Sequence, residues 1–121
     1  MKHQMAYDYI DMAAGEARSR YITVGAGQES TYILKAQHAR EYKDAGYEGN
    51  IPVLVKAEMD ATGESAKVCT DTIILQETQW VYLSGQIETI RRTGKITIKT
   101  MTDPIEISNY CETVVTLLNS I

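Results

Sequence analysis

IRRTGKITIKT, residues 90–100, is the stretch that decides the fold of this chain, because it fits three different structures. These are a phosphate-binding turn, a β-strand and the basic end of a long helix. A phosphate-binding loop needs the pattern G-x-x-x-x-G-K-[ST] after a strand. Here the upstream glycine is missing and Ile96 follows Lys95, so the stretch does not match such a loop.

The second interpretation is a strand at residues 95–100. The run KITIKT alternates polar and apolar side chains, and its β-branched residues favour strands. A strand also needs a partner, which residues 70–75 or 21–24 would have to supply. A minor β-element near 95–100 therefore stays open as an alternative.

The third interpretation is a long helix, and it depends on a seam of positions that repeats every three or four residues. The seam consists of Cys69, Ile73, Gln76, Trp80, Leu83, Ile87, Ile90, Gly94, Ile98 and Met101. Because the seam continues through the quoted stretch, we expect one helix over residues 65–100. In it, Gly94 is either a close-packing position or the residue at which the helix stops. If the ring of Trp80 is buried, Trp80→Ala should cost about 3 to 5 kcal/mol.

Apolar positions at helical spacing predict three helices before this one. The first covers about 5–22, with a stripe formed by Met5, Tyr9, Met12, Ala13, Ala17 and Tyr21. The second covers 28–45, after a turn at Gly25–Gly27, with a stripe formed by Tyr32, Ala36, Ala39 and Tyr42. The third covers about 51–61, and Asn50 is its expected N-cap.

The strongest local signal is TDPIE, residues 102–106. Asp103 at the N-cap, Pro104 at the first helical position and Glu106 at the third form an aspartate version of the capping box. We expect a helix over 104–119, with a stripe formed by Ile107, Cys111, Val114, Val115 and Leu118. Five helices with short connections predict an all-α bundle.

The bulk composition is that of an ordinary globular chain. Its 121 residues predict a single helical domain over 1–121, and 44% hydrophobic and 23% charged residues fit a folded protein. No apolar run is long enough to span a bilayer, so we expect no membrane partner, and the N-terminus lacks the apolar run of a signal peptide. The net charge of −4 argues against a nucleic-acid partner.

The sequence shows no pattern for catalysis or for binding a metal or a cofactor. Cys69 and Cys111 lie far apart, without a CxxC motif, and are expected to be two buried thiols. His38 lies near Glu41, but no serine or cysteine nucleophile is near it in sequence. The acidic residues show no metal-ligand spacing such as ExxH. We therefore expect no enzyme, with no catalytic residues, no cofactor and no metal.

The chain has eight tyrosines and no phenylalanine. Tyrosine combines a large apolar area with a hydroxyl group, which suits half-buried seams and protein interfaces. The helical interpretation of residues 90–100 also directs a row of positive charges outward, where it would meet an acidic partner surface. The candidate protein-interaction residues are Tyr32, Tyr42, Tyr47, Arg91, Arg92 and Lys95.

A series of motifs between residues 8 and 100 resembles a known group of proteins. In chain order the motifs are RSRYIT, GAGQ, TYILKAQHAREY, AGY, AEMDATG and RRTGK. The series resembles small helical proteins or terminal domains encoded in the tail and tail-fibre regions of tailed bacteriophages and prophages. The resemblance implies a helical virion component, made in the cytoplasm of the host bacterium and assembled in multiple copies. Those proteins look alanine-rich near residues 95–100, where this chain has isoleucine and threonine.

The expected function is a non-enzymatic virion structural protein of the tail or tail fibre. It would dock through helix faces on other phage structural proteins or on copies of itself. One alternative is a tail-fibre assembly chaperone that the mature virion does not retain. A second alternative is a small helical regulatory or nucleic-acid-binding protein that uses Arg91, Arg92 and Lys95.

Overall fold

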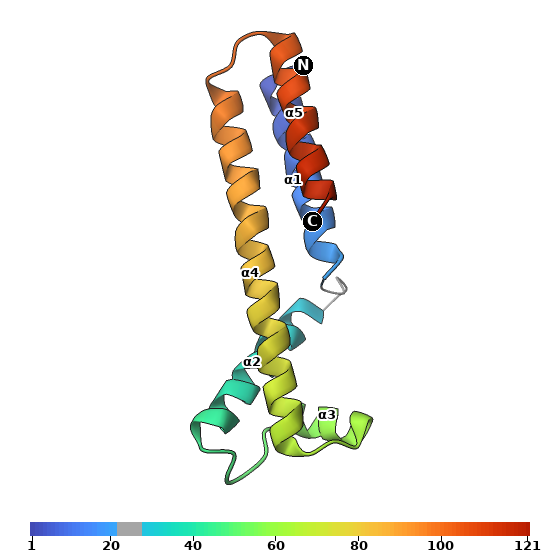
Figure 1. Cartoon of the computed structure of the whole chain (residues 1–121), viewed down its shortest axis with the longest axis vertical. Helices are drawn as coiled ribbons and strands as arrows, with labels where there is room; N and C mark the ends of the chain where they lie inside the picture. Colours follow the sequence, from blue (N-terminus) through green and yellow to red (C-terminus); the bar gives the residue numbers. More distant parts are fainter. Residues whose placement is uncertain (22–27) are drawn as a thin grey trace. The chain divides into compact units, whose positions relative to one another are not determined.

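The computed structural model describes residues 1–21 and 28–121, which form five α-helices without a strand among them (Figure 1). The helices are α1 (His3–Ser19), α2 (Gln28–Asp44), α3 (Val53–Thr62), α4 (Ala66–Lys99) and α5 (Pro104–Asn119). The prediction of an all-α bundle of about five helices is confirmed. The predicted turn at Gly25–Gly27 and the suggested strand partner at residues 22–24 lie outside the described residues.

The quoted stretch is the C-terminal part of α4, so the alternative of a β-element near 95–100 is wrong. Packing overrides the strand preference of the β-branched residues, because helical spacing places Gly94 and Ile98 on the buried side of α4. Gly94 is a close-packing position. A Cβ atom there would lie 3.1 Å from Val114 Cγ1 and 3.4 Å from Ile10 Cδ1.

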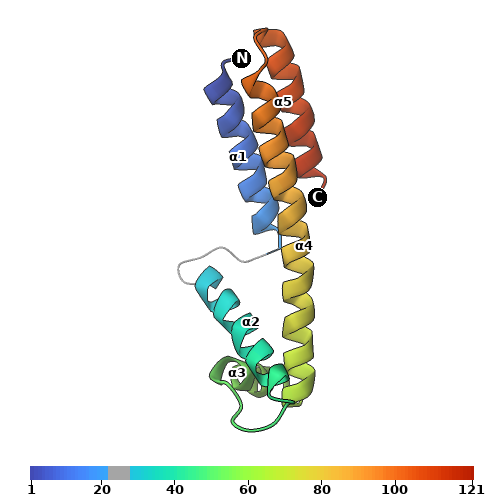
Figure 2. The ribbon, with the colours of Figure 1, turned by 90° about the vertical axis from the view of Figure 1, so that its left-hand side faces the viewer.

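The contacts divide the chain into two compact units. Unit 1 contains Met1–Ile22 and Tyr82–Ile121, and unit 2 contains Thr23–Val81. The prediction of a single domain over 1–121 stays a prediction. In unit 1, α1, α5 and the C-terminal half of α4 lie side by side in both views (Figure 1, Figure 2).

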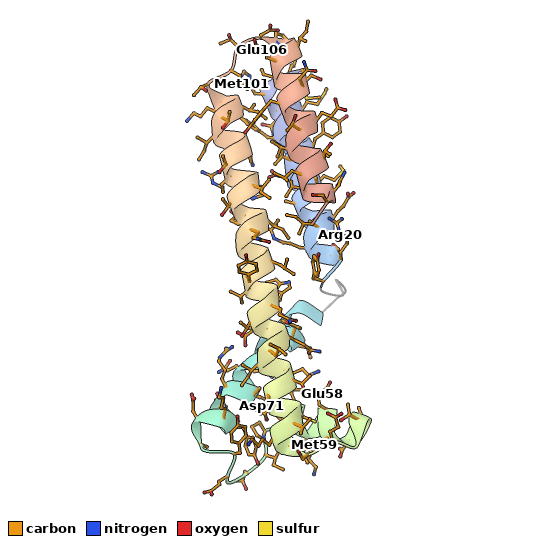
Figure 3. The ribbon with its side chains drawn as sticks, in the orientation of Figure 1. Arg20, Glu58, Met59, Asp71, Met101 and Glu106 are labelled. Carbon is orange, nitrogen blue, oxygen red and sulfur yellow. The ribbon has the colours of Figure 1, made fainter. Side chains whose placement is uncertain are left out.

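Hydrogen bonds at both ends fix the direction of α1 against α5. The Met1 amino group donates to the Pro104 carbonyl at 2.8 Å. At the other end, Arg20 Nη2 donates to the Leu118 carbonyl at 2.8 Å, and Arg20 lies beside the C-terminal end of α5 (Figure 3). The two helices are therefore parallel, and Arg20 satisfies a carbonyl that the end of α5 leaves without a partner in the helix.

The core of unit 1 is formed by small and aliphatic side chains. It contains Ala6, Ile10, Ala13, Ala14, Ala17, Ile87, Ile98, Ile107, Cys111, Val114 and Leu118. On α4 and α5 these are predicted stripe positions. Of the stripe predicted on the first helix, Ala13 and Ala17 are buried. The prediction was wrong for Met5, Tyr9 and Met12, which are exposed, as is Tyr21 beyond the end of α1. The α1 core face is mostly alanine, because helices that approach closely leave room for small side chains only.

Unit 2 has a smaller core between α2, α3 and the N-terminal half of α4. It contains Ala36, Ala39, Val55, Cys69 and Ile73. The α2 stripe is confirmed, with Tyr32 only half-buried. On the α4 seam Gln76 is exposed, and Trp80 is half-buried. The stability loss predicted for Trp80→Ala assumed a buried ring, and this ring is buried only in part.

Capping residues fix where α3 ends and where α4 and α5 begin. The Asp103 carboxylate accepts a hydrogen bond from the Ile105 amide, and Pro104 begins α5. Ser65 Oγ accepts from the Val68 amide at the start of α4. Gly63 ends α3 in the left-handed conformation. The predicted N-cap Asn50 is wrong, because Pro52 occupies that position.

Candidate interaction surface

The three candidate tyrosines lie in unit 2 and have different environments. Tyr42 is buried, which removes it from the surface candidates. Its ring meets the ring of Tyr47 edge-on, with centroids 6.0 Å apart. Tyr32 is half-buried, with its ring centroid 5.9 Å from that of Trp80. Burial, and then the charge of Glu77, raise the pKa of Tyr32.

Tyr47 is held in place by contacts with α4. Its hydroxyl donates to Asp71 Oδ1 at 2.5 Å, and this hydrogen bond raises the pKa of Tyr47. The Lys67 ammonium lies 5.3 Å from the ring centroid. Tyr47 also has a φ of 59°, a region that residues other than glycine rarely adopt. These contacts identify Tyr47 as the residue that fastens the α2–α3 connection to α4.

The candidate basic residues lie in unit 1, and two of them are engaged inside it. Arg91 pairs with Glu88 at 2.8 Å and with Asp11 at 2.9 Å. Lys95 pairs with Asp11 at 2.9 Å. The expectation that Arg91 and Lys95 point outward is wrong, because the carboxylate of Asp11 on α1 draws both cations toward it. Arg92 is exposed.

These ion pairs change how the two carboxyl groups titrate. Hydrogen bonds from Arg91, together with the charges of Arg91 and Arg18, lower the pKa of Glu88 to about 2. Burial alone would raise the pKa of Asp11, but the hydrogen bonds from Lys95 and Arg91 outweigh it and lower this pKa below its ordinary value. The two carboxylates thus form intramolecular ion pairs that hold α1 against α4, rather than a site for a basic ligand.

The Glu88 ion pairs predict a loss of stability in acid. A carboxyl group with a depressed pKa stabilises the fold above its unfolded pKa, and this contribution disappears as the pH falls through the folded value. We expect the stability difference between the natural protein and Glu88→Gln to shrink between pH 4.5 and pH 2. Because the Glu88 side chain is 44% exposed, the difference should be below about 1 kcal/mol per ion pair. Urea unfolding at several pH values measures it, and a pH-independent difference would contradict the assignment.

An apolar face on α1 remains uncovered in unit 1. Met5, Tyr9 and Met12 are 50%, 48% and 60% exposed, and their spacing of four and three residues places them on one side of the helix. We call these three residues the α1 surface. The three residues were predicted in one apolar stripe with Ala13 and Ala17, and the neighbouring alanines are the signal that the buried side of α1 consists of small residues.

His38, the histidine near Glu41, contacts the start of α3. His38 Nδ1 accepts a hydrogen bond from the Leu54 amide at 3.4 Å, in the first turn of α3, so His38 has a packing role. Within residues 1–21 and 28–121, no cluster of three or more potential ligands could hold a metal ion. No helix in the same part of the chain combines the length and apolarity needed to cross a membrane.

No protein family model matches the chain, and neither a curated protein nor a solved structure is significantly similar to it. Its function is therefore inferred from its residues and their geometry. The structure gathers Arg91 and Lys95 around Asp11 in unit 1, and it places the candidate tyrosines in unit 2. Each group is described within its own unit, and the α1 surface is the apolar face that the six predicted residues leave out.

Proposed function

We propose that this chain is a non-enzymatic structural protein of a bacteriophage particle, associated with the tail or tail fibre, that docks through its helix faces. The α1 surface carries this proposal. Three large apolar side chains stay exposed on a helix whose neighbouring face is packed. Methionine and tyrosine are enriched in the buried centres of protein interfaces. The motifs that resemble phage tail and tail-fibre proteins are the reason for proposing a phage particle as the place where this surface docks.

The ion pairs of unit 1 argue against the alternative that the chain is a nucleic-acid-binding protein. A protein that binds nucleic acid neutralises phosphates with free Lys and Arg side chains. Arg91 and Lys95 already pair with Asp11 and Glu88. Phosphate contacts would have to replace these pairs, in a chain that carries a net charge of −4.

Mass spectrometry of purified particles of the encoding phage or prophage tests the proposal. We expect the chain in amounts comparable to those of other tail components. A chain that is missing from particles but bound to immature fibres would be a chaperone, and a chain found in neither would overturn the proposal.

The α1 surface gives a sharper form of this test. The double variant Met5→Glu, Met12→Glu puts charge on a face that the proposal buries in an interface, and desolvating unpaired charge is costly. We expect it to be lost from particles while its circular dichroism spectrum and urea midpoint stay unchanged. The matched control is Val53→Glu, an exposed apolar position on α3, which should remain in particles. Normal incorporation of the double variant would exclude the α1 surface as the docking face.

A further inference from the structure

The α1 surface is the middle of a longer row of exposed positions in unit 1. Its three apolar residues follow one another at steps of four and three. The row extends at the same spacing to Lys2, the N-cap residue of α1, and to Glu16. Both charged residues are exposed. Positions at this spacing lie on one side of a helix, and we call the five of them the α1 row.

The two charges that end the α1 row are not used within the described part of the chain. In residues 1–21 and 28–121, no hydrogen bond or ion pair engages the side chain of Lys2 or of Glu16. The other charged side chains between residues 1 and 20 are all hydrogen-bonded or ion-paired within the chain: Asp8, Asp11, Arg18 and Arg20. The uncovered apolar residues therefore lie between one free cation and one free anion.

The order of these side chains makes the row complementary to itself when it is turned end for end. Tyr9 is at the centre, with Lys2 seven positions before it and Glu16 seven positions after it. In an antiparallel pair of α1 helices, Lys2 of each copy meets Glu16 of the other, and Met5 meets Met12. A parallel pair would place like charges together. A twofold interface requires a patch of this self-complementary kind, in which each contact occurs twice.

The apolar centre and the charged ends of the row contribute in different ways. Removing large apolar side chains from water drives association, and two Tyr9 rings that meet at the centre add an aromatic contact. Charge pairs at the rim of an interface fix its register and exclude wrong partners. The row covers only about four turns of one helix, so we expect a dissociation constant of about 50 μM rather than a tight complex.

We propose that two copies of this chain associate through the α1 row in antiparallel orientation, with Tyr9 at the centre of the pair. The inference rests on the proposed function, because it names the partner of the α1 surface as a second copy of the same chain.

Sedimentation equilibrium of the full chain tests the pairing. At about 500 μM most of the chains are paired, and we expect a mass close to twice the chain mass of 13.5 kDa. Tyr9→Glu should raise the dissociation constant at least about tenfold, because it buries an unpaired charge. The matched control is Tyr82→Glu, at an exposed tyrosine of unit 1 on α4, which should leave it unchanged. A monomer at this concentration, or equal effects of both variants, would overturn the proposal.

An exchange of the end charges tests the second copy and its orientation together. Lys2→Glu and Glu16→Lys should each raise the dissociation constant about tenfold, because either one turns two ion pairs into two repulsions. Both changes agree with the helix dipole, so the fold of α1 tolerates them. The double variant restores opposite charges between the copies, and its dissociation constant should return to within about twofold of the natural value. A double variant as weak as the single ones would contradict the antiparallel pair.

Cross-linking with a short bis-maleimide tests the orientation independently. At a rise of 1.5 Å per residue, the two positions 16 of an antiparallel pair lie about 21 Å apart. Glu16→Cys should therefore cross-link to Lys2→Cys in a mixture and not to itself. The natural cysteines are buried, so the unmodified chain serves as the blank. Efficient self-cross-linking of Glu16→Cys would establish a parallel pair and overturn the antiparallel one.

The two proposals can fail separately. A dimer in solution that is missing from particles would remove the virion function and leave the α1 pairing intact. A monomer that is nevertheless incorporated into particles would remove the pairing and leave the virion function.

Discussion

Replacing Gly94 with leucine is expected to lower the free energy of unfolding of unit 1 by about 3 kcal/mol, the upper end of what overpacking costs in a core. The first added carbon already meets two helices, because it would lie 3.1 Å from Val114 Cγ1 on α5 and 3.4 Å from Ile10 Cδ1 on α1. The rest of the leucine side chain has no room unless α4 moves away from both. Such a shift would loosen the Asp11 ion pairs as well. Urea unfolding followed by far-UV circular dichroism measures the loss.

Gly15→Leu is the matched control for this substitution. Gly15 also lies inside a helix of unit 1, but no atom lies within 4 Å of where its Cβ would be. Leucine favours helix over glycine by up to about 1 kcal/mol, so this variant should be slightly more stable. If both variants shift the urea midpoint in the same direction, Gly94 is not a close-packing residue.

The sequence predicted the helices well because their signals are local. The Asp103–Pro104 start of α5 and the seam of α4 depend on neighbours in the chain. The start of α5 is confirmed, and the seam is buried at Cys69, Ile73, Ile87 and Ile98 but not at Gln76. The buried face of α1 depends on distance between helices, which periodicity does not contain. The predicted stripe placed Met5 and Tyr9 together with Ala13 and Ala17, and spacing alone did not separate the exposed positions from the buried ones. Gly94 was the one residue that pointed to close packing.

The candidate interaction residues show the same limit. The positive charges of Arg91 and Lys95 were visible in the sequence, but their partner Asp11 lies about eighty positions away and meets them only when α1 packs against α4. Tyr42 and Tyr47 were predicted as interaction residues, yet Tyr42 is buried, the two rings contact each other, and Tyr47 also contacts α4. Composition identifies residues that can bind, whereas tertiary contacts decide which of them remain free.

Leu118→Ala is expected to destabilise unit 1 by about 3 kcal/mol, within the range for large-to-small core substitutions. Leu118 is fully buried and packs near the end of α5 against residues of α1. Its carbonyl also accepts the hydrogen bond from Arg20, so a cavity at this position weakens the end where α1 and α5 are held together. Urea unfolding should show the loss, with a wider spread of amide exchange rates in the last turn of α5.

Leu117→Ala provides an internal control one residue earlier in the same helix. Leu117 has the same side chain but is 50% exposed, so its removal should change stability by no more than about 0.5 kcal/mol. The two variants lose the same atoms and differ in burial alone. The difference between their losses of stability therefore measures how much the α1–α5 interface contributes to stability. Helix propensity and chain composition cancel in this comparison. Equal losses would mean that the α5 face in contact with α1 is not the one described above.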